Sequence, residues 1–398
     1  MADRLLPVGE SGMTANMFVD ISTGTEKDED LSNSKVLSFD DKAPNPPKSH
    51  LNRNRVLFTQ NTTKSAVQRR VVPSQAERIL SASGMTNDFY TNVLDWSSRN
   101  VVAVGVKDSV FLWNGNEGSV SLLLNLSGSN TVTSVRWMDS GTHIAIGTSS
   151  GDVQLWDPVK GKQLRSLKGH GSRVGAAAWN SHILSSGSQD GIIMNSDVRV
   201  KQHIVSHYQE HEQEICSLSY NSDGTQLASG GNDNFIKVWD VRDNDSLYTF
   251  NDHFASVKAL TYSPKQTNIL ASGAGAADRT IKVWDTKSGA LINSVQTESQ
   301  VCSVLWSTNS KEIVTTHGHS SNSVCLWSWP KFKKVAEIRG HTDRVLHSTL
   351  SPDGETVCTA GDQTIRFWRL FNSTPSLNLL KQQLNHSRKM QKQGLNVR

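Results

Sequence analysis

The sequence predicts an all-β fold, a closed ring of seven four-stranded blades flanked by two disordered tails. A Trp-Asp pair, or a variant of it, recurs at intervals of 40 to 45 residues. A second series of mostly aromatic residues runs about twenty residues ahead of the first, with the same period. Residues 1–72 and 371–398 lack both series. Two independent registers that share one such period are typical of a WD-repeat β-propeller.

The clearest repeat is 230–242, in which a turn of Gly and Asn leads into an alternating strand that ends at Trp239-Asp240. Alignment on this pair marks positions 113, 156, 196, 239, 284, 327 and 368, of which only Ser196 is not tryptophan. The second series consists of Trp96, Trp137, Trp179, Tyr220, Tyr262, Trp306 and Leu350. Seven units predict seven blades.

The repeats place the propeller at residues 73–370. When the repeats are counted from the first full unit, the last blade is one strand short. We therefore expect residues around Arg78–Leu80 to form the missing strand and to pair beside the last blade near 356–369. This pairing would lock the ring.

The two tails differ from the propeller in composition and charge. Residues 1–41 carry nine acids and three bases, residues 42–72 carry seven bases and no acid, and residues 371–398 carry five bases and no acid. Segments with so few aromatic residues are expected to be disordered in the absence of a partner. No aromatic residue interleaves with the charges of 381–398, so a solvated tail or docking on an acidic partner is favoured over nucleic-acid binding.

Composition and motifs argue against several function classes. The sequence contains neither an apolar run of 18 residues nor a secretory leader, so no membrane association is expected. The four cysteines are scattered, which suits reduced thiols, and we expect a nuclear and cytoplasmic protein. Phosphate-binding loops and nucleophile elbows are absent, so no enzyme, cofactor or metal is predicted. One zinc-peptidase pattern occurs at 207–211, but on a predicted strand and loop rather than a helix.

Histidine and aspartate recur at matching places in four repeats. The histidines precede the first strand of their repeat, and the aspartates lie in the tight turn before the Trp strand: His170, His211, His253 and His341, with Asp190, Asp233, Asp278 and Asp362. Such pairs can serve catalysis, but polar groups inside a blade must also be satisfied. We favour buried hydrogen-bond networks that fix each blade.

Several loop sequences are more specific than the repeat itself. They include Asn-Asp-Phe-Tyr at 87–90, Leu-Ala-Ser-Gly-Gly-Asn-Asp-Asn at 227–234 and Gly-His-Thr-Asp-Arg-Val-Leu at 340–346. Together with matching stretches over about 300 residues, they resemble the fizzy family. Members of that family are co-activators and substrate receptors of the anaphase-promoting complex, a ubiquitin ligase. The resemblance implies a binding protein without catalytic activity.

Short stretches in the tails are similar to docking motifs of the same family. Asp3-Arg4-Leu5-Leu6-Pro7 resembles the C-box that docks on the ligase, although Gly9 stands where an Arg is usual. Lys35-Val36-Leu37 resembles the segment that a spindle-checkpoint protein binds, which favours the fizzy branch over the fizzy-related branch. Val397-Arg398 resembles the Ile-Arg tail that enters a groove in a helical-repeat subunit of the ligase.

The resemblance also implies two degron sites on one face of the ring. For the KEN-type degron it implies Asn232 and Asn234 as amide partners, Gln300 beside them, and Arg344 as the partner of the acidic residue. Asn232 and Asn234 also suit a tight turn, and the two roles are compatible. For the destruction box, Arg-x-x-Leu, it implies a site between the first and last blades.

In that second site the resemblance implies that Asp88 binds the arginine of the destruction box. Gln363 stands where a Glu usually assists, so we expect weaker binding of this degron, by about 1 kcal/mol. The implied partners are subunits of the anaphase-promoting complex, degron-bearing substrates such as cyclins and securin, and spindle-checkpoint proteins. The alternative is a non-catalytic WD-repeat scaffold outside the ubiquitin ligase, which Gly9, Gln363 and Ser196 would support.

Overall fold

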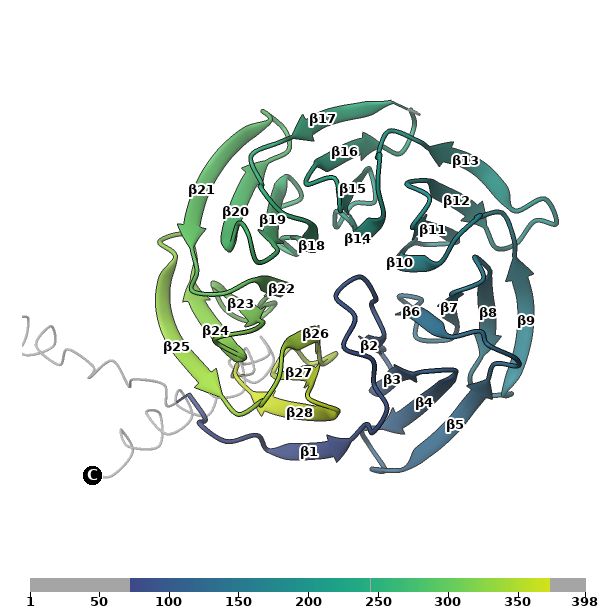
Figure 1. Cartoon of the computed structure of the whole chain (residues 1–398), viewed down its shortest axis with the longest axis horizontal. Helices are drawn as coiled ribbons and strands as arrows, with labels where there is room; N and C mark the ends of the chain where they lie inside the picture. Colours follow the sequence, from purple (N-terminus) through teal and green to yellow (C-terminus); the bar gives the residue numbers. More distant parts are fainter. Residues whose placement is uncertain (1–71, 244, 373–398) are drawn as a thin grey trace, which may run out of the picture. The chain divides into compact units, whose positions relative to one another are not determined.

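The computed structural model describes residues 72–243 and 245–372, and this part of the chain contains strands β1 to β28 and no helix. The strands form seven antiparallel four-stranded sheets, which surround a common centre as the blades of a propeller (Figure 1). The predicted seven-bladed all-β fold is confirmed. The motifs expected at Asp3–Pro7, Lys35–Leu37 and Val397–Arg398 lie outside the described residues.

The first three blades each contain four consecutive strands. Blade 1 consists of β2 (Leu94–Trp96), β3 (Val101–Val106), β4 (Ser109–Asn114) and β5 (Val120–Asn125). Blade 2 consists of β6 (Val132–Trp137), β7 (Ile144–Thr148), β8 (Val153–Asp157) and β9 (Lys162–Leu167). Blade 3 consists of β10 (Val174–Asn180), β11 (Ile183–Ser188), β12 (Ile193–Asp197) and β13 (Ile204–Tyr208).

Blades 4 to 6 repeat the same order. Blade 4 consists of β14 (Ile215–Tyr220), β15 (Gln226–Gly231), β16 (Ile236–Asp240) and β17 (Ser246–Phe250). Blade 5 consists of β18 (Val257–Tyr262), β19 (Ile269–Ala274), β20 (Thr280–Asp285) and β21 (Ala290–Gln296). Blade 6 consists of β22 (Val301–Trp306), β23 (Glu312–His317), β24 (Ser323–Ser328) and β25 (Lys333–Arg339).

Blade 7 combines the two ends of the repeat region. Its strands β26 (Val345–Leu350), β27 (Thr356–Gly361) and β28 (Thr364–Arg369) are joined at the edge by β1 (Arg78–Ser81). The register of β1 on β28 runs from Arg78 opposite Phe367 to Ser81 opposite Thr364. The predicted closing strand is therefore confirmed, in the place expected for it.

Both recurring series of residues occupy equivalent positions in the blades. The Trp-Asp series ends the third strand of each blade, and the second series ends the first strand. Apolar residues from neighbouring blades form clusters between the sheets, as where Val238 of blade 4 packs with Trp284 of blade 5. The outermost strands carry mostly exposed residues, with a few half-buried ones between them. The core is therefore a ring of inter-blade layers, which explains why a single blade could not bury its own apolar faces.

The expected histidine networks are present inside the blades. In blade 4, Trp239 Nε1 donates to Ser229 Oγ (2.9 Å), and His211 bonds to Ser229 through Nε2 (2.8 Å) and to Asp233 through Nδ1 (2.8 Å). With the imidazole protonated on Nδ1, Trp239 donates to Ser229, Ser229 donates to His211 Nε2, and His211 Nδ1 donates to Asp233. Every group in the network then has a partner. Equivalent networks occur in blades 5 and 7, around His253 and His341.

Blade 3 carries a reduced version of this network. His170 Nε2 bonds to Ser186 Oγ (2.8 Å), but Ser196 occupies the tryptophan position and its hydroxyl instead bonds to His203 Nδ1 (3.1 Å). The ring of Tyr208 in the outer strand stacks on Trp239 of the next blade, with centroids 4.5 Å apart. Phe250 and Trp284 stack in the same way between blades 4 and 5, so this contact is a regular part of the inter-blade layers. Ser196 faces blade 2 instead, because its ladder partner Leu184 packs with Leu155 and Leu167 of that blade.

Within residues 72–243 and 245–372, no three His, Cys, Asp or Glu side chains come together as a metal site, and no helix could span a membrane. His207 lies on β13 and Glu210 and His211 follow it in a loop, so the zinc-peptidase pattern is not on a helix. All four cysteines are buried and unpaired.

Candidate functional site

A crossing segment, residues 82–93, connects β1 of blade 7 to β2 of blade 1 and passes over the centre of the ring (Figure 1). Asn92 fixes it there, because its Nδ2 donates to the carbonyls of Gly175 (2.8 Å) and Cys216 (2.9 Å). Both carbonyls lie at β-bulges in the first strands of blades 3 and 4, where the strand ladder is interrupted. The crossing segment therefore supplies hydrogen-bond donors to two carbonyl groups at positions where the strand ladder is interrupted.

Close packing and a buried cation also hold the crossing segment in place. A Cβ added at Gly175 would lie 2.7 Å from the carbonyl oxygen of Tyr90, so only glycine lets the segment pass this closely. From below, Lys258 Nζ donates to the carbonyl of Thr91 (2.9 Å) and lies 5.4 Å from the centre of the Phe89 ring. Burial lowers the pKa of Lys258 to about 8.

The crossing segment places an ion-pair network at the mouth of the ring. Arg173 donates to Asp88 Oδ2 from Nη1 (2.8 Å) and to both carboxylate oxygens of Glu214 from Nε (2.7 Å) and Nη2 (2.8 Å). Burial raises the pKa of Glu214, and the paired Arg173 opposes this, while Glu214 in turn raises the pKa of Arg173. The two parallel hydrogen bonds between them are the geometry of an ionised pair.

Asn232 lies where the crossing segment meets blades 4 and 5. Its Oδ1 accepts hydrogen bonds from the Tyr90 hydroxyl (3.1 Å) and from Ser256 Oγ (2.5 Å), and its Nδ2 donates to Gln213 Oε1 (2.7 Å). Its amide is thereby oriented by three neighbours. Asn234, two residues later, adopts a left-handed conformation with φ of 70° and forms the turn before β16. This backbone role agrees with the expectation that both asparagines suit a turn.

Arg344 lies on the opposite side of the crossing segment. Its Nε donates to Asn87 Oδ1 (2.8 Å) and its Nη2 to the Asn87 carbonyl (2.9 Å). Both residues line a cavity of about 210 Å³ between the crossing segment and blade 7. Gln363 lines the same cavity, and its Oε1 lies 3.4 Å from the Gly84 amide nitrogen, which donates to it. Apolar surface comes from Met85, Leu346 and Ala360.

Gln300 is buried, with 8% of its surface exposed. Its side chain is packed against Gly318, where an added Cβ would lie 2.0 Å from Gln300 Nε2, and it donates weakly to Cys302 Sγ (3.6 Å). It directly precedes β22 of blade 6. Within the described chain, its side chain forms no hydrogen bond with Asn232 or Asn234.

The structure groups the predicted residues differently from the sequence-based expectation. Asp88 was expected beside Gln363 between the first and last blades, but its carboxylate pairs with Arg173 of the loop before blade 3. Adjacent Asn87 contacts Arg344 instead, so the two neighbours contact opposite sides of the mouth. Asp88 thus belongs with Asn232 in one network, whereas Gln363 belongs with Arg344 in the cavity against blade 7.

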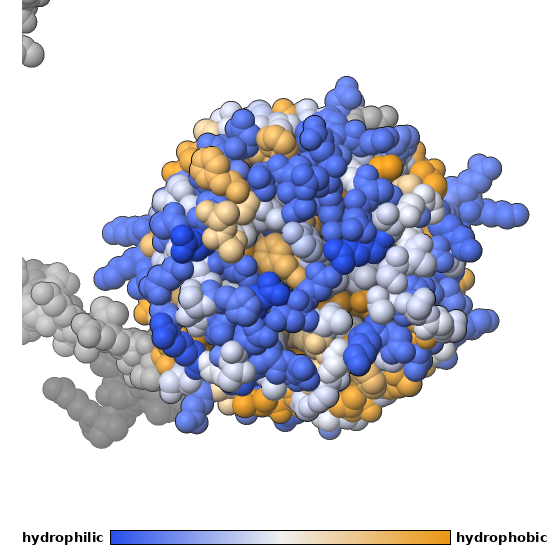
Figure 2. All heavy atoms as spheres, viewed as in Figure 1, coloured by the Kyte–Doolittle hydropathy of each residue, from blue (hydrophilic) through white to orange (hydrophobic). Residues whose placement is uncertain are grey.

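Four residues at the mouth carry no role in the sequence-based prediction. They are Tyr90, Arg173, Glu214 and Lys258. A signal existed for Lys258, a lone cation in the otherwise apolar run of β18, and for Glu214, an acid directly before the apolar start of β14. Arg173 has the same position directly before the apolar start of β10, and Tyr90 lies in the loop sequence at 87–90 that resembles the fizzy family. Figure 2 shows that this face of the ring is mostly hydrophilic, as expected for a mouth built from these polar groups. Some apolar residues lie near its centre.

Comparison with known proteins connects this architecture to one family. The profile of the CDC20/Fizzy WD40 domain matches residues 80–368. The protein named anaphase-promoting complex subunit cdc20 of Dictyostelium discoideum is 47% identical over 361 residues, which cover 87% of this chain and 72% of that protein. Protein FIZZY-RELATED 3 of Arabidopsis thaliana is 47% identical over 305 residues, covering 76% of this chain and 63% of that protein.

A solved structure agrees with these sequence matches. A chain in the crystal structure of a mitotic checkpoint complex superposes with a TM-score of 0.75 at 42% identity, covering 76% of this chain and 98% of that chain. Relatives named for both branches are similarly close, so the branch is not resolved by identity. The matched region contains all seven blades and the crossing segment, and the chain therefore belongs to the CDC20/Fizzy family of WD40 proteins.

Proposed function

We propose that this chain is a substrate-recognition co-activator of the anaphase-promoting complex, and that it acts by binding degrons rather than by catalysis. Support comes from its family and from relatives whose names include that complex. The observation that carries the proposal is the crossing segment, which gathers an acid, a base and an amide over the mouth of the ring. Such a surface suits short polar peptides.

The KEN-type degron contains one lysine, one glutamate and one asparagine, and the mouth offers a complementary group to each. Arg344 is a partner for the glutamate, and Asn232 and Asn234 offer amides to the asparagine. Asp88, whose side chain is 31% exposed, offers a carboxylate to the lysine. We assign Asp88 to this degron, instead of to the destruction box, because it contacts Arg173 and not the cavity of Gln363.

The KEN site can be tested by fluorescence anisotropy with a labelled KEN peptide and the full chain. Arg344→Ala removes a charge-assisted contact, and we expect affinity to fall by about tenfold to a hundredfold. Asn232→Ala should weaken binding as well. The matched control is Arg242→Ala, an exposed arginine after β16 that is outside the mouth. Unchanged affinity in Arg344→Ala, or an equal loss in the control, would reject the assignment.

For the destruction box we propose the cavity against blade 7. Its apolar residues suit the leucine of Arg-x-x-Leu, and Gln363 lies at its edge. Because glutamine is neutral, it offers the arginine a weaker acceptor than glutamate would. We expect Gln363→Glu to bind an Arg-x-x-Leu peptide about fivefold more tightly than the parent chain, with KEN affinity unchanged. Equal affinity of the two proteins for this peptide would contradict the proposal.

In this proposal the tails attach the propeller to the ligase, with Asp3–Pro7 as the C-box and Val397-Arg398 as the C-terminal anchor. Lys35–Leu37 serves checkpoint binding, which favours the fizzy branch, and the protein acts in nucleus and cytoplasm. Attachment at several points raises the effective concentration of substrate lysines near the conjugating enzyme. A pull-down with and without the last two residues distinguishes a co-activator from an independent scaffold, because only a co-activator should retain ligase subunits and lose some of them on truncation.

A further inference from the structure

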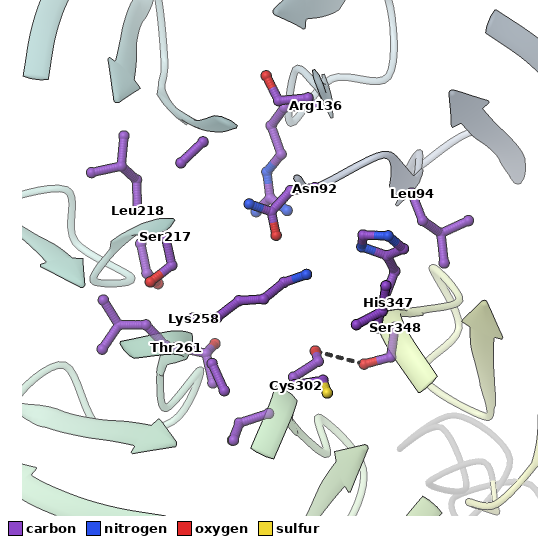
Figure 3. A pocket seen from close by; sticks show the side chains of 18 of the residues that line it. Asn92, Leu94, Arg136, Ser217, Leu218, Lys258, Thr261, Cys302, His347 and Ser348 are labelled. Carbon is purple, nitrogen blue, oxygen red and sulfur yellow. Dashed lines mark hydrogen bonds between the residues drawn. The ribbon is translucent and has the colours of Figure 1, made fainter. Parts of the chain in front are cut away.

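The centre of the ring contains a polar cavity that the proposed degron sites do not use. It has a volume of about 170 Å³ and is lined by the first strands of all seven blades, with Asn92 of the crossing segment beside them (Figure 3). Its polar lining comprises hydroxyl groups together with Arg136, Lys258 and His347. None of the described residues that line it is an aspartate or a glutamate. The cavity is therefore positively charged.

One polar atom of a residue that lines this cavity, His347 Nε2, lacks a hydrogen-bond partner within the described chain, and His347 is only 4% exposed. The Ser134 hydroxyl also lacks a partner there, but it lies between blades 2 and 3, where a Cβ added at Gly147 would be 2.2 Å from it. Buried polar atoms almost always have a partner in native proteins. Figure 3 shows the imidazole of His347 on the wall of the cavity, facing the end of the Lys258 side chain. The imidazole of His347 and the ammonium group of Lys258 thus face one space.

Lys258 also has unused hydrogen-bonding capacity. Its ammonium group carries three donors, of which one bonds to the carbonyl of Thr91. No carboxylate in the described part of the chain forms an ion pair with it, although it is buried. Arg136, at the edge of the cavity, lies 3.5 Å from Asp95 and is only partly neutralised. A buried ammonium group without a counter-charge is costly, and an anion would remove that cost.

We propose that this central cavity binds a small tetrahedral oxyanion of the phosphate or sulfate type, held by Lys258 and His347, with Arg136 at its edge. Water can also fill a polar cavity of this size, but water does not neutralise the two cations. The site lies beneath the crossing segment and shares Lys258 with it through Thr91. Its occupant is a free ion and not part of a degron, so the proposal does not depend on the proposed function.

The test is calorimetric titration of the full chain with sodium phosphate, at constant ionic strength set with sodium chloride, together with ³¹P NMR. We expect one saturable site, competition by sulfate, and affinity at least about tenfold lower in Arg136→Gln and in Lys258→Met. The matched control is Arg242→Gln, an exposed arginine that does not line the cavity. This control should bind phosphate like the parent chain.

Arg136→Gln keeps the proposal testable if Lys258→Met does not fold, because the Arg136 side chain is about half exposed (49%) and its loss should be tolerated. Absence of saturable phosphate binding by the parent chain would overturn the proposal. So would unchanged affinity in Arg136→Gln, or an equal loss in Arg242→Gln, since the latter would indicate diffuse attraction to surface cations. Selective loss in the cavity variants supports the site.

Discussion

Asp362 shows how a single side chain can stabilise a blade and respond to pH. Its Oδ1 bonds to His341 Nδ1 (2.6 Å), and its Oδ2 accepts from the Thr342 amide (3.0 Å) and from Arg366 (3.1 Å). Burial raises the pKa of this carboxyl, but hydrogen bonds from Thr364, Thr342 and His341 outweigh burial. The pKa of Asp362 is therefore lowered from 3.8 to about 2.

Because this carboxyl is more acidic in the folded protein than in the unfolded chain, it stabilises the fold above about pH 4 and loses that effect as the pH falls toward 2. We expect Asp362→Asn to lower the free energy of unfolding at pH 7 by about 1–2 kcal/mol. The difference from the parent chain should shrink between pH 3.8 and about 2. Urea unfolding at several pH values measures it, with exposed Asp139→Asn as the control. A difference independent of pH would contradict this.

At the scale of elements, the closing strand β1 is held by apolar contacts on one of its faces and by backbone pairing with β28 along one edge. Leu80 packs into the cluster between blades 1 and 7 with Trp113 and Phe367, whereas the side chain of Ile79 is exposed. The guanidinium of Arg78 lies 5.3 Å from the centre of the Trp113 ring. The strand therefore joins the ring through alternate residues, as its period of two requires.

This alternation predicts unequal effects of two neighbouring substitutions. Leu80→Ala should lower the free energy of unfolding by about 1–2 kcal/mol, because it leaves a gap beside Trp113. Ile79→Ala, one residue away, should change it by less than about 0.5 kcal/mol. Chemical denaturation of both variants compares them directly. Similar losses in both would mean that β1 contributes mainly through its backbone pairing with β28.

The elements were more predictable than the site. The Trp-Asp period located the third strand of every blade, and the missing fourth strand of blade 7 located β1, because both follow from local pattern and from closure of the ring. The partner of Asp88 could not be predicted in this way. It depends on the path of the crossing segment, which is set by Asn92 and by bulges 83 and 124 residues further along the chain.

At the scale of the whole molecule, Asn92 bonds to blades 3 and 4 through its side chain and to blade 2 through its backbone amide, which donates to the Thr133 carbonyl (3.0 Å). Asn92→Ala would leave the carbonyls of Gly175 and Cys216 without their partner at the bulges. We expect a loss of about 2–3 kcal/mol in the free energy of unfolding. Amide hydrogen exchange should also become faster in residues 82–93, because the segment loses its tie to blades 3 and 4.

The exposed turn variant Asn116→Ala provides the control for this measurement, and it should affect neither stability nor exchange in the crossing segment. If Asn92→Ala left exchange in residues 82–93 unchanged, the segment would have to be held mainly by Lys258 and by packing against Gly175. Comparison of the two variants thus separates the contribution of the Asn92 hydrogen bonds from that of the other contacts that hold the crossing segment.

The strand that completes blade 7 runs directly into the segment that carries Asp88, Asn87 and Tyr90. A mechanical pull that detached β1 would draw those residues away from Arg173 and Arg344. The proposed degron sites would then be lost while blades 1 to 6, formed by β2 to β25, stayed intact, so these sites depend on the pairing of β1 with β28.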